Sequence, residues 1–249
     1  MKAVLFQALL KMRRWFAGVS FFFFVGSAFA DGTTPTRIAQ NGGASPEPVQ
    51  AAKSVAAASM SDVAIGDHWT YDVRDEIAGA VILTRKYIVT DISGGQIAMR
   101  VDVVNSSRQS GSIVYDKSWN ILRDGANRYS PNSGTGIQSP LKLTAEWKTT
   151  ADEINGNNGN AWKIAVSSRV TGQESVTTKA GTFDTYAIET MQAIRNAKNP
   201  AANSQITIRT WFAPDVNHWV RRNFVRRVGG LIVGNETMEL VEYGRKSAE

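Results

Sequence analysis

The chain has 249 residues, no cysteine, and a formal net charge of +6 from 28 Lys and Arg residues against 22 Asp and Glu residues. The lack of cysteine excludes stabilisation by disulfides and excludes a lipid anchor attached through a cysteine thiol. Four of the basic residues precede the first acid, Asp31, so the chain after residue 30 carries 24 − 22 = +2. This near balance argues against nucleic acid as a partner.

The first 30 residues have the pattern of an export signal. Four basic residues between positions 2 and 14 precede an uncharged apolar segment, Trp15–Ala30, which ends in Ala-Phe-Ala. This segment has 16 residues, fewer than the roughly 20 that a membrane-spanning helix needs. We therefore predict a cleaved signal peptide, residues 1–30, a periplasmic or secreted location, and no membrane span after cleavage. The adjacent Arg13 and Arg14 also fit a twin-arginine signal, so the export route stays open.

Residues 31–61 differ in composition from the rest of the chain. They are rich in Ala, Gly, Ser, Thr and Pro and contain no aromatic residue. Such a segment buries too little apolar surface to offset the entropy of ordering it, so we predict a disordered spacer. We predict one β-rich domain over residues 62–246 and a short C-terminal tail at 247–249.

The domain alternates between apolar and polar residues with a period of two. Trp69, Tyr71 and Val73 alternate with polar residues at its start. The same alternation recurs in three further segments, 97–103, 141–148 and 162–169. Because neighbouring side chains of a strand point to opposite faces, this pattern predicts strands with one buried face.

Turn residues separate these predicted strands. Ser93-Gly94-Gly95 and the Asn/Gly-rich segment 155–160 suit tight hairpins, and 130–134 marks a longer loop. No run of a dozen residues has helical periodicity. We therefore predict an all-β fold, a strongly curved antiparallel sheet or open β-barrel, with a sandwich as the alternative.

Three short motifs resemble a known family. They are a Gly-x-x-Trp-x-Tyr strand at 66–71, an Ala-Gly-Thr-Phe turn at 180–183, and a Trp-Phe-x-Pro segment at 211–214. Together they resemble a family of uncharacterised bacterial periplasmic domains of unknown function. The resemblance implies a curved antiparallel sheet similar to that of lipoprotein carriers, and it implies no catalytic residue.

Six tryptophans fall in the predicted domain. They can fill the interior of a curved sheet, or they can line an apolar cavity that is open at one end and suits an acyl chain. The sequence leaves both alternatives open.

Sequence motifs for catalysis are lacking. There is no cysteine nucleophile, Gly-x-Ser-x-Gly elbow, His-Glu-x-x-His helix or phosphate-binding glycine loop. The two histidines, His68 and His218, are 150 residues apart in the chain, and we interpret both as surface or rim residues. We predict no catalytic residue, no metal ligand and no cofactor. A hydrolase built on paired carboxylates stays an alternative.

The segment 219–227 holds four arginines. On a strand, Arg222 and Arg226 share one face with Phe224, and Arg221 and Arg227 share the other. Guanidinium groups on a sheet bind carboxylate or phosphate groups. The alternative is an edge strand and hairpin tip, where long arginines reach water and prevent aggregation.

These observations predict a non-enzymatic periplasmic binding or accessory module for an apolar or amphiphilic ligand, such as an anionic envelope lipid. The predicted ligand contacts are Arg221, Arg222, Arg226, Arg227, Trp211 and Trp219. The alternative is a structural or assembly protein of the cell envelope that docks a protein partner.

Overall fold

The structure is a computed structural model that describes residues 63–196 and 198–245. The predicted signal peptide, spacer and C-terminal tail lie outside the described residues.

The described residues form twelve antiparallel strands. In chain order they are β1 (His68–Asp75), β2 (Ala80–Ser93), β3 (Gln96–Val103), β4 (Gly111–Asp116), β5 (Ile121–Asp124), β6 (Asn127–Ser130), β7 (Glu146–Asn155), β8 (Ala161–Thr178), β9 (Gly181–Arg195), β10 (Ser204–Ala213), β11 (His218–Val228) and β12 (Leu231–Gly244). One turn of 3₁₀-helix, η2 (Pro200–Ala202), precedes β10.

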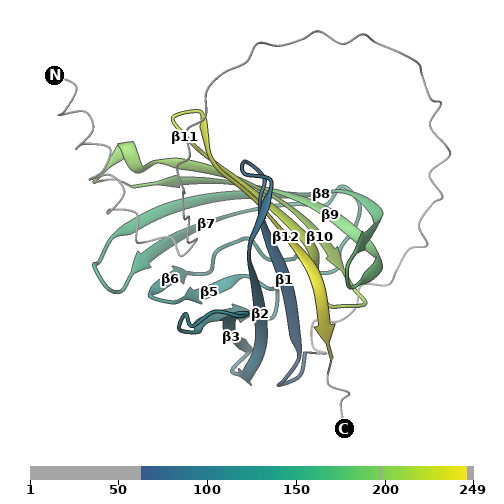
Figure 1. Ribbon diagram of the computed structural model, residues 1–249. Coiled ribbons are helices and arrows are strands. Elements are labelled where there is room, and N and C mark those ends of the chain that lie inside the picture. The colour runs from purple at the N-terminus through teal and green to yellow at the C-terminus, as the bar shows by residue number, and fades with distance from the viewer. Residues whose placement is uncertain (1–62, 197, 246–249) are drawn as a thin grey trace, which may run out of the picture.

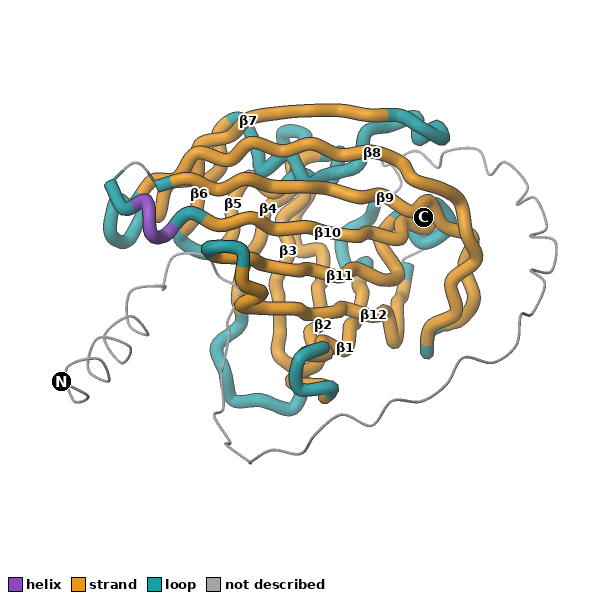
Figure 2. Tube along the Cα trace, turned by 90° about the horizontal axis from the view of Figure 1, so that it is seen from above, coloured by secondary structure: helices purple, strands orange, loops and turns teal. Residues whose placement is uncertain are grey.

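The strands form a closed barrel in which each pairs with its neighbours in sequence. Closure comes from β1, which pairs with β2 on one side and with the last strand, β12, on the other. Trp69, for example, lies opposite both Tyr87 and Tyr243. Figure 1 shows the first strand (blue) against the last (yellow), and Figure 2 shows the same sheet from above. The prediction of an all-β, strongly curved antiparallel sheet or barrel is confirmed.

The hairpin turns lie where the sequence predicts them. Ser93 ends β2 before the Gly94-Gly95 turn, and segment 156–160 joins β7 to β8. The predicted strand at 141–148 is wrong over its first half, because β7 begins only at Glu146. Leu143 is 54% exposed, and Thr144 has a positive φ of 64°, a backbone conformation that interrupts a strand.

Aromatic side chains fill one end of the barrel. Trp69, Trp119 and Trp219 are buried there around His218. The His218 ring centroid lies 4.6 Å from that of Trp69, 4.6 Å from that of Trp119 and 3.7 Å from that of Trp219. This packing closes the end of the barrel that contains the start of β1 and of β11.

The interpretation of His218 as a surface or rim residue is therefore wrong, since its exposed fraction is 0%. The Tyr71 hydroxyl donates to the Trp219 carbonyl oxygen (2.8 Å) and lies 2.5 Å from His218 Nδ1. Burial holds the pKa of His218 well below its usual value, so the ring is neutral.

The predicted long loop, which lies between β6 and β7, packs against this aromatic end of the barrel. Ile137 N donates to the Ser118 carbonyl oxygen (2.6 Å), and Gly136 N donates to Asn120 Oδ1 (2.8 Å). Ile137 and Leu141 join the buried core. The backbones approach so closely that a Cβ on Gly136 would lie 2.2 Å from the Ser118 carbonyl oxygen.

Gly136→Ala should therefore destabilise the protein by about 2 kcal/mol, because neither backbone can move without breaking the loop contacts. Gly172→Ala is the matched control, since a Cβ there meets nothing within 4 Å, and we expect a change within about 0.5 kcal/mol. Urea denaturation of both variants measures the difference. Equal stability of the two variants would show that the two backbones do not approach as closely as described.

Candidate ligand-binding cavity

Beyond the aromatic end, the barrel encloses a cavity of about 770 Å³. Side chains from every strand except β1 line it. Trp219 and Tyr115 lie at its closed end, and the exposed segment 108–112 borders it, so the cavity opens near the β3–β4 loop. Its volume is in the range of about 300–1,000 Å³ that is typical of small-molecule sites.

Most of the wall is apolar. The apolar residues that line it include Ile113, Ile164, Ile194, Ile206, Ile208 and Phe224. These side chains alternate with outward residues on their strands, as the period of two requires. The structure thus combines the two alternatives for the interior: one end is filled by aromatic rings, and the other is hollow.

Arg222 is the charged residue at the closed end of the cavity, with only 5% of its surface exposed. Its Nε donates to Thr210 Oγ1 (3.0 Å) and its Nη2 to the Thr135 carbonyl oxygen (3.0 Å). The guanidinium carbon lies 4.4 Å from the Trp219 ring centroid. Burial lowers the pKa of Arg222, but arginine stays charged in proteins.

All these contacts of Arg222 are with neutral groups. In the part of the chain that the structure describes, no carboxylate lies within ion-pair distance of its guanidinium. A buried cation without a counter-charge is unfavourable, and an anionic group in the cavity would relieve that cost.

A second set of ionisable groups lines the cavity toward the β5–β6 turn. Burial raises the pKa of Asp124 to about 6, and the nearby Arg85 charge offsets part of this rise. Burial, together with repulsion from Asp124, raises the pKa of Glu153 to about 7. The Tyr129 hydroxyl, which donates a hydrogen bond to Glu153, and the Arg226 charge both act in the opposite direction.

The six predicted contact residues divide between the two faces of the sheet. Trp219 and Arg222 line the cavity. Arg226 follows Phe224 on the same side of β11, and its charge acts on Glu153. Arg227 is half-buried beside the β11–β12 turn, where it pairs with Ile232.

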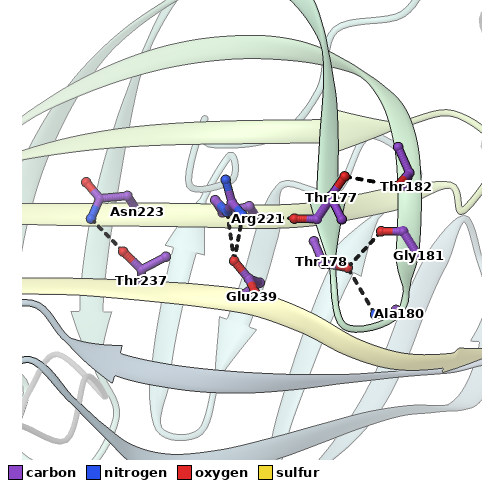
Figure 3. Close-up of polar contacts among 9 residues, drawn as sticks. All are labelled: Thr177, Thr178, Ala180, Gly181, Thr182, Arg221, Asn223, Thr237 and Glu239. Carbon is purple, nitrogen blue, oxygen red and sulfur yellow. Dashed lines mark hydrogen bonds and ion pairs between the residues drawn. The ribbon is translucent and has the colours of Figure 1, made fainter.

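Trp211 and Arg221 lie on the outer surface. Both form hydrogen bonds with the part of the β8–β9 hairpin that lies near its turn. Trp211 Nε1 donates to Glu174 Oε1 (2.6 Å). Arg221 Nη2 donates to Glu239 Oε2 (2.7 Å) and to the Thr177 carbonyl oxygen (3.1 Å), as Figure 3 shows. These contacts give both side chains a structural role on the outside of the barrel.

The interpretation of the arginine segment as an edge strand is wrong, because β11 pairs with β10 on one side and β12 on the other. The closed sheet leaves its backbone groups no free edge. Half of the segment is therefore directed into the barrel rather than to water.

Sequence reasoning missed Arg85, Asp124, Tyr129 and Glu153. Asp124 and Tyr129 come from β5 and β6, strands of only four residues each, too short for an alternation to be recognised. The Asp124-Gly125 pair is the sequence feature that indicates this part of the chain, because Asp-Gly suits a hairpin turn. The inner face of β7 contains Thr149, Ala151 and Glu153, and it lacks the run of large apolar residues that marks a buried face.

Within residues 63–196 and 198–245, no three His, Cys, Asp or Glu side chains are grouped as ligands for a metal ion. The same residues include no helix with the length and apolar character to cross a membrane.

The fold and cavity define an antiparallel barrel with one sealed end and a mixed apolar and charged interior. Residues 71–224 match the DUF3108-like family. Since this match covers more than half of the chain, the protein belongs to that family. The predicted membership in a family of uncharacterised domains is confirmed. The matched segment includes β2 to β10 and all four ionisable residues that line the cavity near the β5–β6 turn.

Three solved structures resemble the barrel at low sequence identity. A predicted lipoprotein from Parabacteroides distasonis is 15% identical, with a TM-score of 0.49 over 73% of this chain and 96% of that one. A predicted exported protein with a YmcC-like fold from Bacteroides fragilis is 12% identical, with a TM-score of 0.47 over 74% of this chain and 97% of that one. The hypothetical lipoprotein YmcC from Escherichia coli is 11% identical, with a TM-score of 0.42 over 74% and 88%. No curated protein matches the sequence, and these similarities carry no functional argument.

The Glu153 carboxyl makes the protein less stable as the pH rises. Its pKa is about 7 in the folded state against an ordinary value of 4.5, so the folded state holds the proton more tightly between these values. The free energy of unfolding should therefore fall from about pH 4.5 to about pH 7. Glu153→Gln should be more stable than the wild type by about 2 kcal/mol at about pH 8, and similar to it at about pH 4.

Urea denaturation at both pH values checks this, with Glu146→Gln on the exposed face of the same strand as the control. If Glu153→Gln keeps the full pH dependence of the wild type, the carboxyl is not buried as described.

Proposed function

We propose that the protein is a non-enzymatic binding or accessory module of the periplasm, which holds an apolar or amphiphilic ligand inside the barrel. The observation that carries this proposal is the cavity of about 770 Å³ with an apolar wall and Arg222 at its closed end. An amphiphile with an anionic group fits this arrangement, since its chain would contact the isoleucines and its charge would lie near Arg222.

Three of the predicted contacts, Trp219, Arg222 and Arg226, are retained in this proposal because they are directed to the interior. Trp211 and Arg221 are bound to acids on the outer face, so the proposal gives them no ligand contact. Arg227 lies at the β11–β12 turn and is likewise left out. The periplasmic location rests on the export signal predicted in the first 30 residues.

Blocking the cavity should abolish binding without changing the outer surface. Val103 lines the cavity, while the next residue, Val104, is exposed and does not. Val103→Trp should weaken binding of the fluorescent amphiphile 11-(dansylamino)undecanoic acid by about tenfold or more, equivalent to about 1.4 kcal/mol. Val104→Trp should leave it unchanged. Fluorescence titration of both variants measures this, and equal binding by the two would exclude the interior as the site.

Docking of an envelope protein is the second candidate function, and one observation favours it. The β1–β2 and β11–β12 hairpin tips project from the same end of the barrel (Figure 1), because Asp75 pairs with Glu236. Their exposed aliphatic residues are Ile77, Val81, Ile82, Leu231, Ile232 and Val233. Exposed apolar groups that gather in this way mark interaction surfaces.

A photo-crosslinking residue in place of Leu231 separates the two functions, with the equally apolar and exposed Met191 as the control position. Under the ligand-binding proposal, native mass spectrometry of protein from its own periplasm shows a bound small molecule, and neither position gives a protein adduct. An adduct with one defined protein at Leu231 alone, together with an empty barrel, would replace ligand binding by docking.

A further inference from the structure

Glu153 is a hydrogen-bond acceptor that faces the cavity with one oxygen unused. The residue is 1% exposed and lines the cavity. The Tyr129 hydroxyl donates to its carboxylate, while Glu153 Oε1 has no hydrogen-bond partner among the described residues. Buried polar atoms are nearly always paired, so an unpaired one at a cavity wall points to a missing partner.

The groups around Glu153 do not supply that partner. Asp124 is an acid and repels the carboxylate, and Arg226 acts on the carboxyl group through its charge. Asn155, two residues farther along the same strand, donates from Nδ2 to Asn127 Oδ1 (2.7 Å), and Glu153 Oε1 receives no hydrogen bond from any described residue. What fits at Oε1 is therefore a donor that comes from the cavity itself.

Glu153 and Arg222 lie in opposite halves of the cavity. Across the sheet, Arg222 aligns with Thr210, Ile188 and finally Val170 on β8. Glu153 aligns with Trp162, which is 170 − 162 = 8 residues away along that strand. Apolar side chains, among them Ile164 and Ile208, line the wall between the two.

We propose that Glu153, held in place by Tyr129, is a second polar subsite that accepts a hydrogen bond from a hydroxyl or ammonium group of the ligand. This inference rests on the proposed binding function. The ligand is then an amphiphile with two polar positions: an anionic group at Arg222 and a donor group, farther along its chain, at Glu153. A simple fatty acid fits only the first position. It leaves Glu153 Oε1 as a buried acceptor without a donor, which is unfavourable.

Matched long-chain acids test the subsite in the full chain by competition with the dansyl probe. The set is hexadecanoic acid, its 10-hydroxy and 16-hydroxy derivatives, and 16-aminohexadecanoic acid. At about pH 8 the wild type should bind at least one substituted acid about tenfold more tightly than hexadecanoic acid, because a hydrogen bond to a charged acceptor contributes about that much.

Two variants identify the acceptor and the donor. Glu153→Leu should lose the preference for substituted acids and bind hexadecanoic acid more tightly, because no acceptor is left unpaired. Glu153→Gln keeps a neutral acceptor, so it should retain a preference for a hydroxyl and lose one for an ammonium group. Glu146→Leu, on the outer face of the same strand, should behave as the wild type.

The outcomes separate this inference from the function it rests on. If hexadecanoic acid and the probe both fail to bind the wild type, the binding proposal and the subsite both fall. If they bind, but no substituted acid is preferred and Glu153→Leu is indistinguishable from the wild type, the subsite alone is overturned. Thermal melts of each variant confirm that a lost preference is measured on folded protein.

Discussion

The hydrogen bonds between the first and the last strand are the constraint on which the rest of the structure depends. Because β1 pairs with β12 as well as β2, the sheet has no free edge, and every strand gains an inside and an outside. Closure brings residues that are far apart in the chain, such as Arg222 and Tyr87, around one interior space. Without that pairing, the inner face would lie open to water.

The interior has one end filled with aromatic side chains and one end that encloses a cavity. Aromatic rings around His218 fill one end so tightly that a histidine there is neutral and fully buried. The other end holds Arg222, Asp124 and Glu153 in a partly apolar cavity, where burial makes each charge costly. Under the proposed function, a ligand would supply an anionic partner to Arg222 and a donor to Glu153.

Some elements could be predicted because their signals are local. Trp69, Tyr71 and Val73 alternate with polar residues, and they form the buried face of β1. The same alternation misled at 141–148, because Leu141 is buried as part of the loop before β7 and not as part of a strand. The prediction for His218 was wrong for a related reason. A polar residue is interpreted as exposed unless the residues that surround it in the fold are known.

The sequence by itself determined that the chain is β-rich, where its main hairpins turn, and which arginines share a face, since these depend on the pleat and on residues next to one another. Only the tertiary structure decided that Arg222 is inside and Arg221 outside, and that Asp124 of β5 and Glu153 of β7 line one cavity with Arg222. The direction of a face, and the side chains that meet across the interior, depend on how the sheet closes. Closure is set by the packing of all twelve strands together, and no single segment encodes it.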